Sequence, residues 1–183
     1  MSGLDRMALV VVDVQEAFRD AAYWGRRNNP ACEGNVEALI AAWRAAGRRV
    51  VFVRHDSVEE GSPLAPGGAG NAFLPIVAGE PDLLVGKTVN SAFHGTPDLD
   101  AWLRAEGLDG IVVCGITTNH CCETTARVGA NLGWRVLFAL DATHTFDRAG
   151  PDGTVMTADE LARATATNLH GEFADVVATA ELL

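Results

Sequence analysis

One cysteine near the middle of the chain is the side chain best suited to covalent chemistry. Cys121 follows the apolar run 110–114, which is typical of a buried parallel strand, and it lies where helical spacing begins. At the first turn of a helix, backbone N–H groups point outward and the helix dipole favours negative charge. These conditions lower the pKa of a thiol and make it a nucleophile. The sequence therefore predicts covalent catalysis by Cys121.

Two charged residues are candidates to assist this thiol. Asp13 ends the apolar run 7–12, where desolvation should raise the pKa of a carboxyl group and suit it to act as a general base. The alternative is that Asp13 caps a helical segment that begins near Gln15. Lys87 is the only lysine among 14 basic residues, and it can reach Asp13 or a substrate oxygen.

Histidine offers a rival mechanism, because a Cys–His pair can also generate a thiolate. His55 is the best-placed partner, at the end of the second predicted strand, although a polar loop lining accounts for it as well. His120 directly precedes Cys121, so its side chain should diverge from the thiol. Cys122 should also diverge, since adjacent residues on a helix point about 100° apart.

The elements that must position these residues alternate between strands and helices, which implies a parallel sheet covered on both faces. With right-handed crossovers, we expect one α/β domain over 1–183 with three α/β/α layers. Its doubly wound, mostly parallel six-stranded sheet should have the Rossmann-like order 3-2-1-4-5-6. The predicted strands are 7–12, 50–53, 83–85, 110–114, 134–140 and 175–177, and the predicted helices are 33–46, 97–106, 119–132 and 158–170.

This order makes the first and fourth strands neighbours at the point where ligands bind in such sheets. Asp13 and Cys121 should therefore meet in one crevice although they are far apart in the sequence. Two helix starts are also predicted. Pro97 should occupy the first helical position, and Thr157 with Glu160 should form a capping box.

Composition excludes several classes of partner. The formal net charge of −10 should repel nucleic acid and anionic membrane surfaces. No signal peptide is apparent, and no apolar run approaches the roughly 20 residues of a membrane span. The four cysteines lack the spacing of a zinc site, and a chain of 183 residues does not need disulfides to fold. We expect a cytoplasmic protein.

Three ordered motifs resemble those of the isochorismatase-like cysteine hydrolases, over nearly the whole chain. That family has an aspartate in an Asp-x-Gln setting, a lysine ahead of Ser-Ala-Phe, and Gly-x-x-Thr-x-x-Cys followed by residues similar to Thr-Ala-Arg. Each motif alone is weak, but the ordered set is specific. The matching residues are Asp13 and Gln15, Lys87 with Ser91, Ala92 and Phe93, and Gly115, Thr118, Cys121, Thr125, Ala126 and Arg127.

The resemblance implies a catalytic triad of Asp13, Lys87 and Cys121. It also implies a cis peptide bond between Ile116 and Thr117, for which an ordinary tight turn is the alternative. The N–H groups of Thr117 and Cys121 would then form an oxyanion hole. In the implied reaction, Asp13 takes the thiol proton, the sulfur attacks an amide-type carbonyl, and water hydrolyses the thioester.

Departures from relatives narrow the expected substrate. Nicotinamidases in the family have an Asp-Trp-His metal motif after the second strand, but this chain has Arg-His-Asp-Ser at 54–57, so no metal or other cofactor is expected. Isochorismatases that cleave a vinyl ether often lack the cysteine, so Cys121 favours hydrolysis of a C–N bond in an amide or lactam. The segments 23–30 and 57–79 resemble a bacterial subgroup that includes streptothricin hydrolase, which opens a lactam amide.

The expected substrate pocket includes Phe18, Trp24, His55, Phe93 and Asn119. Core packing is an equally good account of the three aromatic side chains. Relatives form dimers or tetramers, so a homodimer or homotetramer is expected, and the loops 19–31 and 57–79 should line the pocket of their own or a neighbouring subunit.

Two other functions stay open. A vinyl ether hydrolase of the isochorismatase type would need only Asp13 and Lys87, and thiol alkylation would not affect it. A redox or ligand-binding protein would use the Cys121–Cys122 pair, although disulfides between adjacent cysteines are strained and rare.

Overall fold

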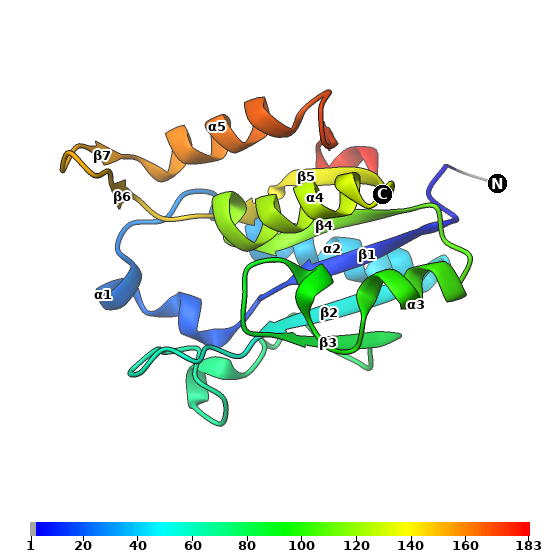
Figure 1. The fold of residues 1–183 in the computed structure, drawn as a ribbon, viewed down its shortest axis with the longest axis horizontal. Helices are drawn as coiled ribbons and strands as arrows, with labels where there is room; N and C mark the ends of the chain where they lie inside the picture. Colours follow the sequence, from blue (N-terminus) through cyan, green and yellow to red (C-terminus); the bar gives the residue numbers. More distant parts are fainter. Residues whose placement is uncertain (1–2) are drawn as a thin grey trace.

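A parallel sheet forms the centre of the computed structural model, which describes residues 3–183 (Figure 1). Its six strands follow the order β3-β2-β1-β4-β5-β8, and each neighbouring pair is parallel. The predicted α/β architecture is confirmed, with β8 as the sixth strand. The strands are β1 (Met7–Val12), β2 (Val50–His55), β3 (Leu83–Lys87), β4 (Gly110–Ile116), β5 (Arg135–His144) and β8 (Asp175–Val177).

Helices cover both faces of the sheet and complete three layers. Helix α2 (Cys32–Ala45) packs on one face, and α3 (Leu99–Ala105), α4 (Glu123–Asn131) and α5 (Ala158–Leu169) pack on the other (Figure 1). The short helix α1 (Ala21–Trp24) lies in the connection that follows β1. Within residues 3–183, no helix has the length and apolar character needed to cross a membrane.

Strand β1 shows why the sheet must be covered on both sides. All six of its residues are buried, and successive side chains point to opposite faces. Leu9 and Val11 join the core beneath α2, whereas Val10 and Val12 join the core beneath the other three helices. A run of apolar residues without alternation is therefore what this central strand requires.

Two elements near the carboxyl ends of the strands differ from the prediction. Residues 119–132 do not form one α-helix, because a wider π-helical turn, Thr118–Cys122, precedes α4. Such a turn buries one face much as an α-turn does, so the spacing of apolar residues does not distinguish them. The strand predicted at 134–140 continues to His144, because a register shift between Val113 and Gly115 on β4 lets pairing resume beyond it.

The predicted helix starts have opposite outcomes. Pro97 is not the first residue of α3, because the Asp98 carboxylate accepts a hydrogen bond from the Ala101 N–H at 3.1 Å and is therefore the N-cap. A cis bond joins Pro97 to the residue before it. The capping box at α5 is confirmed: Thr157 Oγ1 accepts from the Glu160 N–H at 3.2 Å, and the Glu160 carboxylate accepts from the Thr157 N–H at 2.8 Å.

A small antiparallel ribbon was not predicted. It consists of β6 (Arg148–Ala149) and β7 (Val155–Met156), and it extends away from the main sheet next to α5 (Figure 1). Strands of two residues are too short for an alternating pattern to be visible in the sequence.

Candidate active site

Three neighbouring strands end in side chains that meet at one edge of the sheet. Asp13 directly follows β1, His55 ends β2 and Lys87 ends β3. The register pairs His55 with Lys87, and the Asp13 N–H donates to the Val53 carbonyl at 2.9 Å. Parallel pairing thus brings together residues that are distant in the sequence.

The backbone conformation is unusual just after β1 and on its neighbour β4. Asp13 has a positive φ of 51°, a conformation that aspartate tolerates better than most residues. Gly115 pairs with Val12 and has a φ of 121°, and a Cβ atom there would lie 2.0 Å from the Val12 carbonyl oxygen. Only glycine fits at this close approach of β4 to β1. Asp13 is not a helix cap, since the turn that begins at Glu16 has no side-chain cap.

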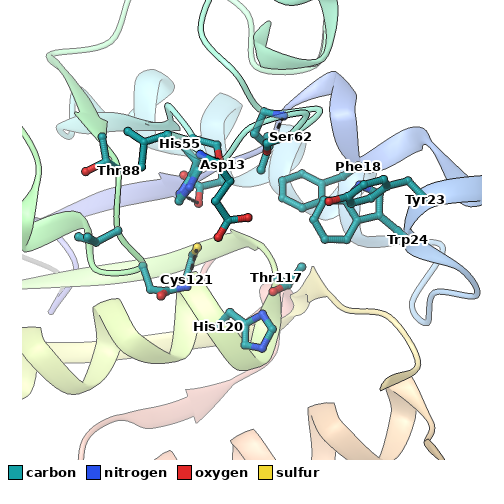
Figure 2. A pocket seen from close by; sticks show the side chains of 16 residues that line it. Asp13, Phe18, Tyr23, Trp24, His55, Ser62, Thr88, Thr117, His120 and Cys121 are labelled. Carbon is teal, nitrogen blue, oxygen red and sulfur yellow. Dashed lines mark hydrogen bonds and ion pairs between the residues drawn. The ribbon is translucent and has the colours of Figure 1, made fainter. Parts of the chain in front are cut away.

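Asp13, Lys87 and Cys121 are in contact in the interior, and Figure 2 shows Asp13 and Cys121 of this group. The Lys87 ammonium donates to Asp13 Oδ2 at 2.6 Å and to Cys121 Sγ at 3.4 Å, and the carboxylate and the ammonium are both buried. Asn90 Nδ2 donates to the same sulfur at 3.6 Å. The second carboxylate oxygen, Asp13 Oδ1, accepts no hydrogen bond from the described residues. The sulfur therefore has two donors and a neighbouring unsatisfied acceptor.

The pKa of the Cys121 thiol is raised, whereas the helix-dipole argument predicts a lowered one. Burial, with the nearby Asp13 carboxylate as the next cause, raises the pKa of Cys121 to about 12, and Lys87 only partly opposes this. Burial alone would lower the pKa of Lys87, but Asp13 and Cys121 together hold that pKa above its ordinary value. The site therefore contains an ion pair between Lys87 and Asp13 beside a neutral Cys121 thiol.

His55 lies beside Lys87 and contacts its ammonium group. Its Nδ1 lies 3.1 Å from Lys87 Nζ and 4.0 Å from Asp13 Oδ2. Burial and the Lys87 charge lower the pKa of His55, so a neutral imidazole accepts from the ammonium. The Gln15 side chain holds this strand end in place, because it accepts from the His55 N–H at 2.8 Å and donates to the His55 carbonyl at 3.1 Å.

One group of potential metal ligands occurs among residues 3–183. Single ligand atoms of Asp13, His55 and Cys121 lie within 4.8 Å of one another. The Lys87 ammonium lies within hydrogen-bond distance of all three, so a cation already occupies the space between them. A metal ion would have to displace it against like charge, so these residues do not fit a resident metal.

Cys121 opens into a cavity of about 260 Å³, here called the Cys121 cavity (Figure 2). Cys121 is 8% exposed there, whereas Cys122 is fully buried in the core. The peptide bond between Ile116 and Thr117 is cis, and Thr117 lies on the cavity wall beside the cysteine. The residues lining it are Asp13, Phe18, Tyr23, Trp24, His55, Ser57, Val58, Glu59, Ser62, Leu64, Thr88, Val89, Asn90, Thr117, His120 and Cys121.

Two residues expected in this pocket lie outside its lining. Phe93 is partly buried and packs against the core toward α4, so close that a Cβ atom on Gly129 would lie 3.0 Å from its ring. Asn119 bonds through its side chain to the Thr145 hydroxyl, which directs it away from the cavity. Their positions next to the lysine and cysteine motifs suggested pocket residues, but adjacent residues point in different directions.

Comparison with known proteins shows which family and which solved structures the chain resembles. The model of the isochorismatase domain matches residues 7–181. The chain belongs to the isochorismatase family. A solved structure of a putative hydrolase of this family from Chromobacterium violaceum is similar over 100% of this chain and 93% of that one, with a TM-score of 0.92 and 40% identity.

Relatives with named activities include three hydrolases. Nicotinamidase 3 of Arabidopsis thaliana is 33% identical over 93% of this chain and 83% of its own length. Ureidoacrylate amidohydrolase of Azorhizobium caulinodans is 31% identical over 81% of this chain and 79% of its own. Streptothricin hydrolase of Streptomyces noursei is 35% identical over 79% of this chain, but the match spans only 52% of that enzyme.

Sequence reasoning missed Asn90 as a cavity residue, and it expected the loops 19–31 and 57–79 in the wall without identifying Tyr23 and Glu59 within them. Asn90 directly precedes the Ser-Ala-Phe element, so its proximity to the lysine motif was a usable signal. Glu59 lies in the Gly/Pro-rich segment 57–79, where no periodic pattern indicates which side chains turn inward. His120 lines the cavity as well, although its ring diverges from the cysteine (Figure 2).

Proposed function

We propose that this protein hydrolyses a non-peptide C–N bond, in an amide or lactam, through a thioester on Cys121. The observation that carries the proposal is the buried Lys87 ammonium, which bridges Asp13 Oδ2 and Cys121 Sγ, and both of these residues line the Cys121 cavity. The named amidohydrolase activities of relatives support the same bond type.

In the first step, the thiol loses its proton as it attacks. Asp13 Oδ1 is the acceptor, because Oδ2 is already engaged by Lys87. A thiol with a pKa of about 12 does not ionise by itself near neutral pH, so proton transfer accompanies formation of the S–C bond. Lys87 and Asn90, both donors to the sulfur, stabilise the negative charge that develops there.

The carbonyl oxygen becomes an oxyanion in the same step. The N–H groups of Thr117 and Cys121 stabilise it, with Thr117 placed on the cavity wall beside the sulfur. The intermediate collapses when the C–N bond breaks, and the proton held by Asp13 passes to the leaving nitrogen. Water, deprotonated by Asp13, then adds to the thioester carbonyl, releasing the acid and restoring the thiol.

A vinyl ether hydrolase is the second candidate, since such an enzyme needs only the carboxylate and the lysine. The position of Cys121 argues against it, because the sulfur of this residue receives two hydrogen bonds in the cavity. A lactam such as that of streptothricin is one substrate within the proposed class, supported by the similarity to streptothricin hydrolase.

The proposed setting is a reducing cytoplasm in a bacterium, with the chain working without metal as a homodimer or homotetramer. The four free cysteines fit a reducing compartment, and the contacts of Lys87 fit a site without metal.

Ammonia or amine release from a panel of amides, lactams and ureides, with an enol ether included, tests the proposal. Cys121→Ala should abolish turnover of every C–N substrate, whereas Cys122→Ala, the matched control one residue away, should retain it. Mass spectrometry with a slow amide should find an acyl group on Cys121. Amide turnover by Cys121→Ala, or cleavage of the enol ether alone, would refute the proposed function.

A further inference from the structure

The charges around the Cys121 cavity do not cancel. Asp13 and Lys87 neutralise each other at 2.6 Å. Burial lowers the pKa of both His55 and His120, so both rings are neutral near pH 7. The one remaining charged side chain in the lining is Glu59, and among the described residues no arginine faces this cavity. The cavity therefore has a net negative charge.

Glu59 is available to a ligand. Among residues 3–183, its carboxylate makes no hydrogen bond or ion pair, and the side chain is exposed. Its backbone is held more firmly: the Glu59 N–H donates to Ser57 Oγ at 3.2 Å, and its carbonyl accepts from the Ser62 N–H at 3.2 Å. A fixed backbone with an unpaired carboxylate is suited to binding a cation.

Aromatic side chains form another part of the wall. The Phe18 and Trp24 rings are 4.9 Å apart, and those of Tyr23 and Trp24 are 4.8 Å apart. Figure 2 shows the three gathered on one side of the cavity, across from Asp13 and His55. Trp24 is fixed by its indole N–H, which donates to the Ala17 carbonyl at 2.9 Å. Ammonium groups bind favourably against such aromatic surfaces.

We propose that the Cys121 cavity takes amides that also carry a cationic group, an ammonium or quaternary ammonium, bound by Glu59 and the aromatic cluster of Phe18, Tyr23 and Trp24. The reacting amide would lie at Cys121, so the inference rests on the proposed function for that end of the substrate. A carboxylate in the same position would face Glu59 with no compensating cation, so anionic amides are poor substrates.

An adjoining cavity of about 420 Å³ differs in its charged residues. It shares Tyr23, Trp24, Thr117 and His120 with the Cys121 cavity, and it is also lined by Arg148 and by Asp147, whose carboxylate is already paired with Arg26 at 2.9 Å. Arg148 is exposed, lies on β6 and contributes to the lowered pKa of His120. A cation should avoid that side, which confines the cationic group to the part of the site near Glu59.

Thiol reagents of matched size test the charge preference without any substrate. Three methanethiosulfonates, carrying a trimethylammonium, a sulfonate or a neutral alkyl group, would be reacted with the protein, and the Cys121 adduct followed by mass spectrometry. The cationic reagent should react about tenfold faster than the anionic one relative to their rates with a free thiol. Glu59→Gln should lower this ratio of rates about fivefold.

Glu60→Gln is the matched control, because Glu60 is the adjacent exposed carboxylate and does not line the cavity. It should leave the ratio unchanged, and Cys121→Ser should give no adduct. An equal effect of both glutamate variants would overturn the inference, since it would reflect the overall charge of the protein. Faster reaction of the anionic reagent would also overturn it and would make Arg148 the dominant charge.

Amide substrates separate this inference from the proposed function. 6-Aminohexanamide and hexanamide differ in one ammonium group, and the wild type should prefer the former in kcat/KM about tenfold, mostly through KM. Cleavage of both without preference would refute the inference and leave the proposed function intact. A reagent preference that depends on Glu59, without cleavage of any amide, would support a cation-binding cavity and refute the hydrolase.

Discussion

The cluster of Asp13, Lys87 and Cys121 and the surrounding wall of the Cys121 cavity are built in different ways. Asp13, Lys87 and Cys121 lie at or just beyond strand ends, all three are buried, and hydrogen bonds connect them. Tyr23 and Glu59 lie in connecting segments, and their side chains are exposed. The cluster therefore depends on the sheet, whereas the wall depends on local turns such as the one that Ser57 and Ser62 hold around Glu59.

This difference separates two kinds of substitution. In the cluster, a change should affect folding and chemistry together, because an unpaired buried charge is costly and the same charges perform the proposed reaction. In the wall, a change should alter which substrate binds while leaving the fold intact. Each of the following predictions tests one side of this contrast.

The largest effect is expected from Lys87→Met. Asp13 is fully buried and loses its ion-pair partner, so the free energy of unfolding should fall by about 3–5 kcal/mol. Turnover should fall at least about 1,000-fold. Urea denaturation and amine release measure the two effects.

Two further variants make this result decisive. Asp13→Asn added to Lys87→Met should recover much of the lost stability and none of the activity, because the buried charge is gone while the base is still missing. Tyr23→Ala, in the wall, should change unfolding by less than about 0.5 kcal/mol and act on KM. If Tyr23→Ala destabilised the protein as much as Lys87→Met, the contrast would be wrong.

The next effect concerns the backbone that supports the cluster. Gly115→Ala would place a Cβ atom 2.0 Å from the Val12 carbonyl oxygen, so unfolding should become easier by at least about 3 kcal/mol. Gly133→Ala is a matched control: its φ of 90° is also positive, but nothing lies within 4 Å of the added atom. It should cost about 1 kcal/mol. Equal losses in thermal or urea unfolding would show that backbone conformation, and not the contact with β1, determines the effect.

The same contrast explains what the sequence could predict. The alternation of strands and helices was sufficient to predict the strand order and, with it, the meeting of Asp13 and Cys121, because parallel strand ends converge at one edge. The direction of the thiol's pKa shift was predicted wrongly, since the helix-dipole argument ignores burial, which is the largest cause here.

Sequence reasoning identified the wall only in part. Phe18, Trp24 and His55 line the cavity as expected, but Phe93 packs against the core, and Glu59 lines the cavity although only its segment, 57–79, was expected there. Irregular segments have no periodic pattern that relates position to direction, so the side that faces inward depends on individual turn hydrogen bonds.

His144 can be compared with Asp13, because both are buried titratable groups. Asp13 has Lys87 as an ion-pair partner, whereas His144 has no such partner among the described residues. Neither ring nitrogen has a hydrogen-bond partner among the described residues. Burial, with Arg27 as the second cause, lowers the pKa of His144 from 6.5 to about 3, and Glu33 only partly opposes this. Below pH 6.5 the unfolded chain binds a proton that the folded chain does not, so stability falls as pH falls.

The expected loss at pH 5 is about 2 kcal/mol relative to pH 7. Urea denaturation at both values should show it in the wild type, and His144→Leu should show a pH dependence smaller by that amount. Identical pH dependence in the two proteins would indicate that His144 ionises normally in the folded state. Carboxylates that titrate in this range contribute equally to both proteins and cancel in the difference.

The smallest effect is expected at Asn90. This residue belongs to both the wall and the cluster, because its side chain is exposed in the cavity wall and also donates to the Cys121 sulfur at 3.6 Å. This donor favours the thiolate, so Asn90→Ala should raise the pH at which iodoacetamide modifies Cys121 and lower kcat about tenfold. Asn90→Asp should raise that pH further, because it adds a negative charge. An unchanged alkylation profile with a raised KM would place Asn90 on the substrate and assign stabilisation of the sulfur to Lys87 alone.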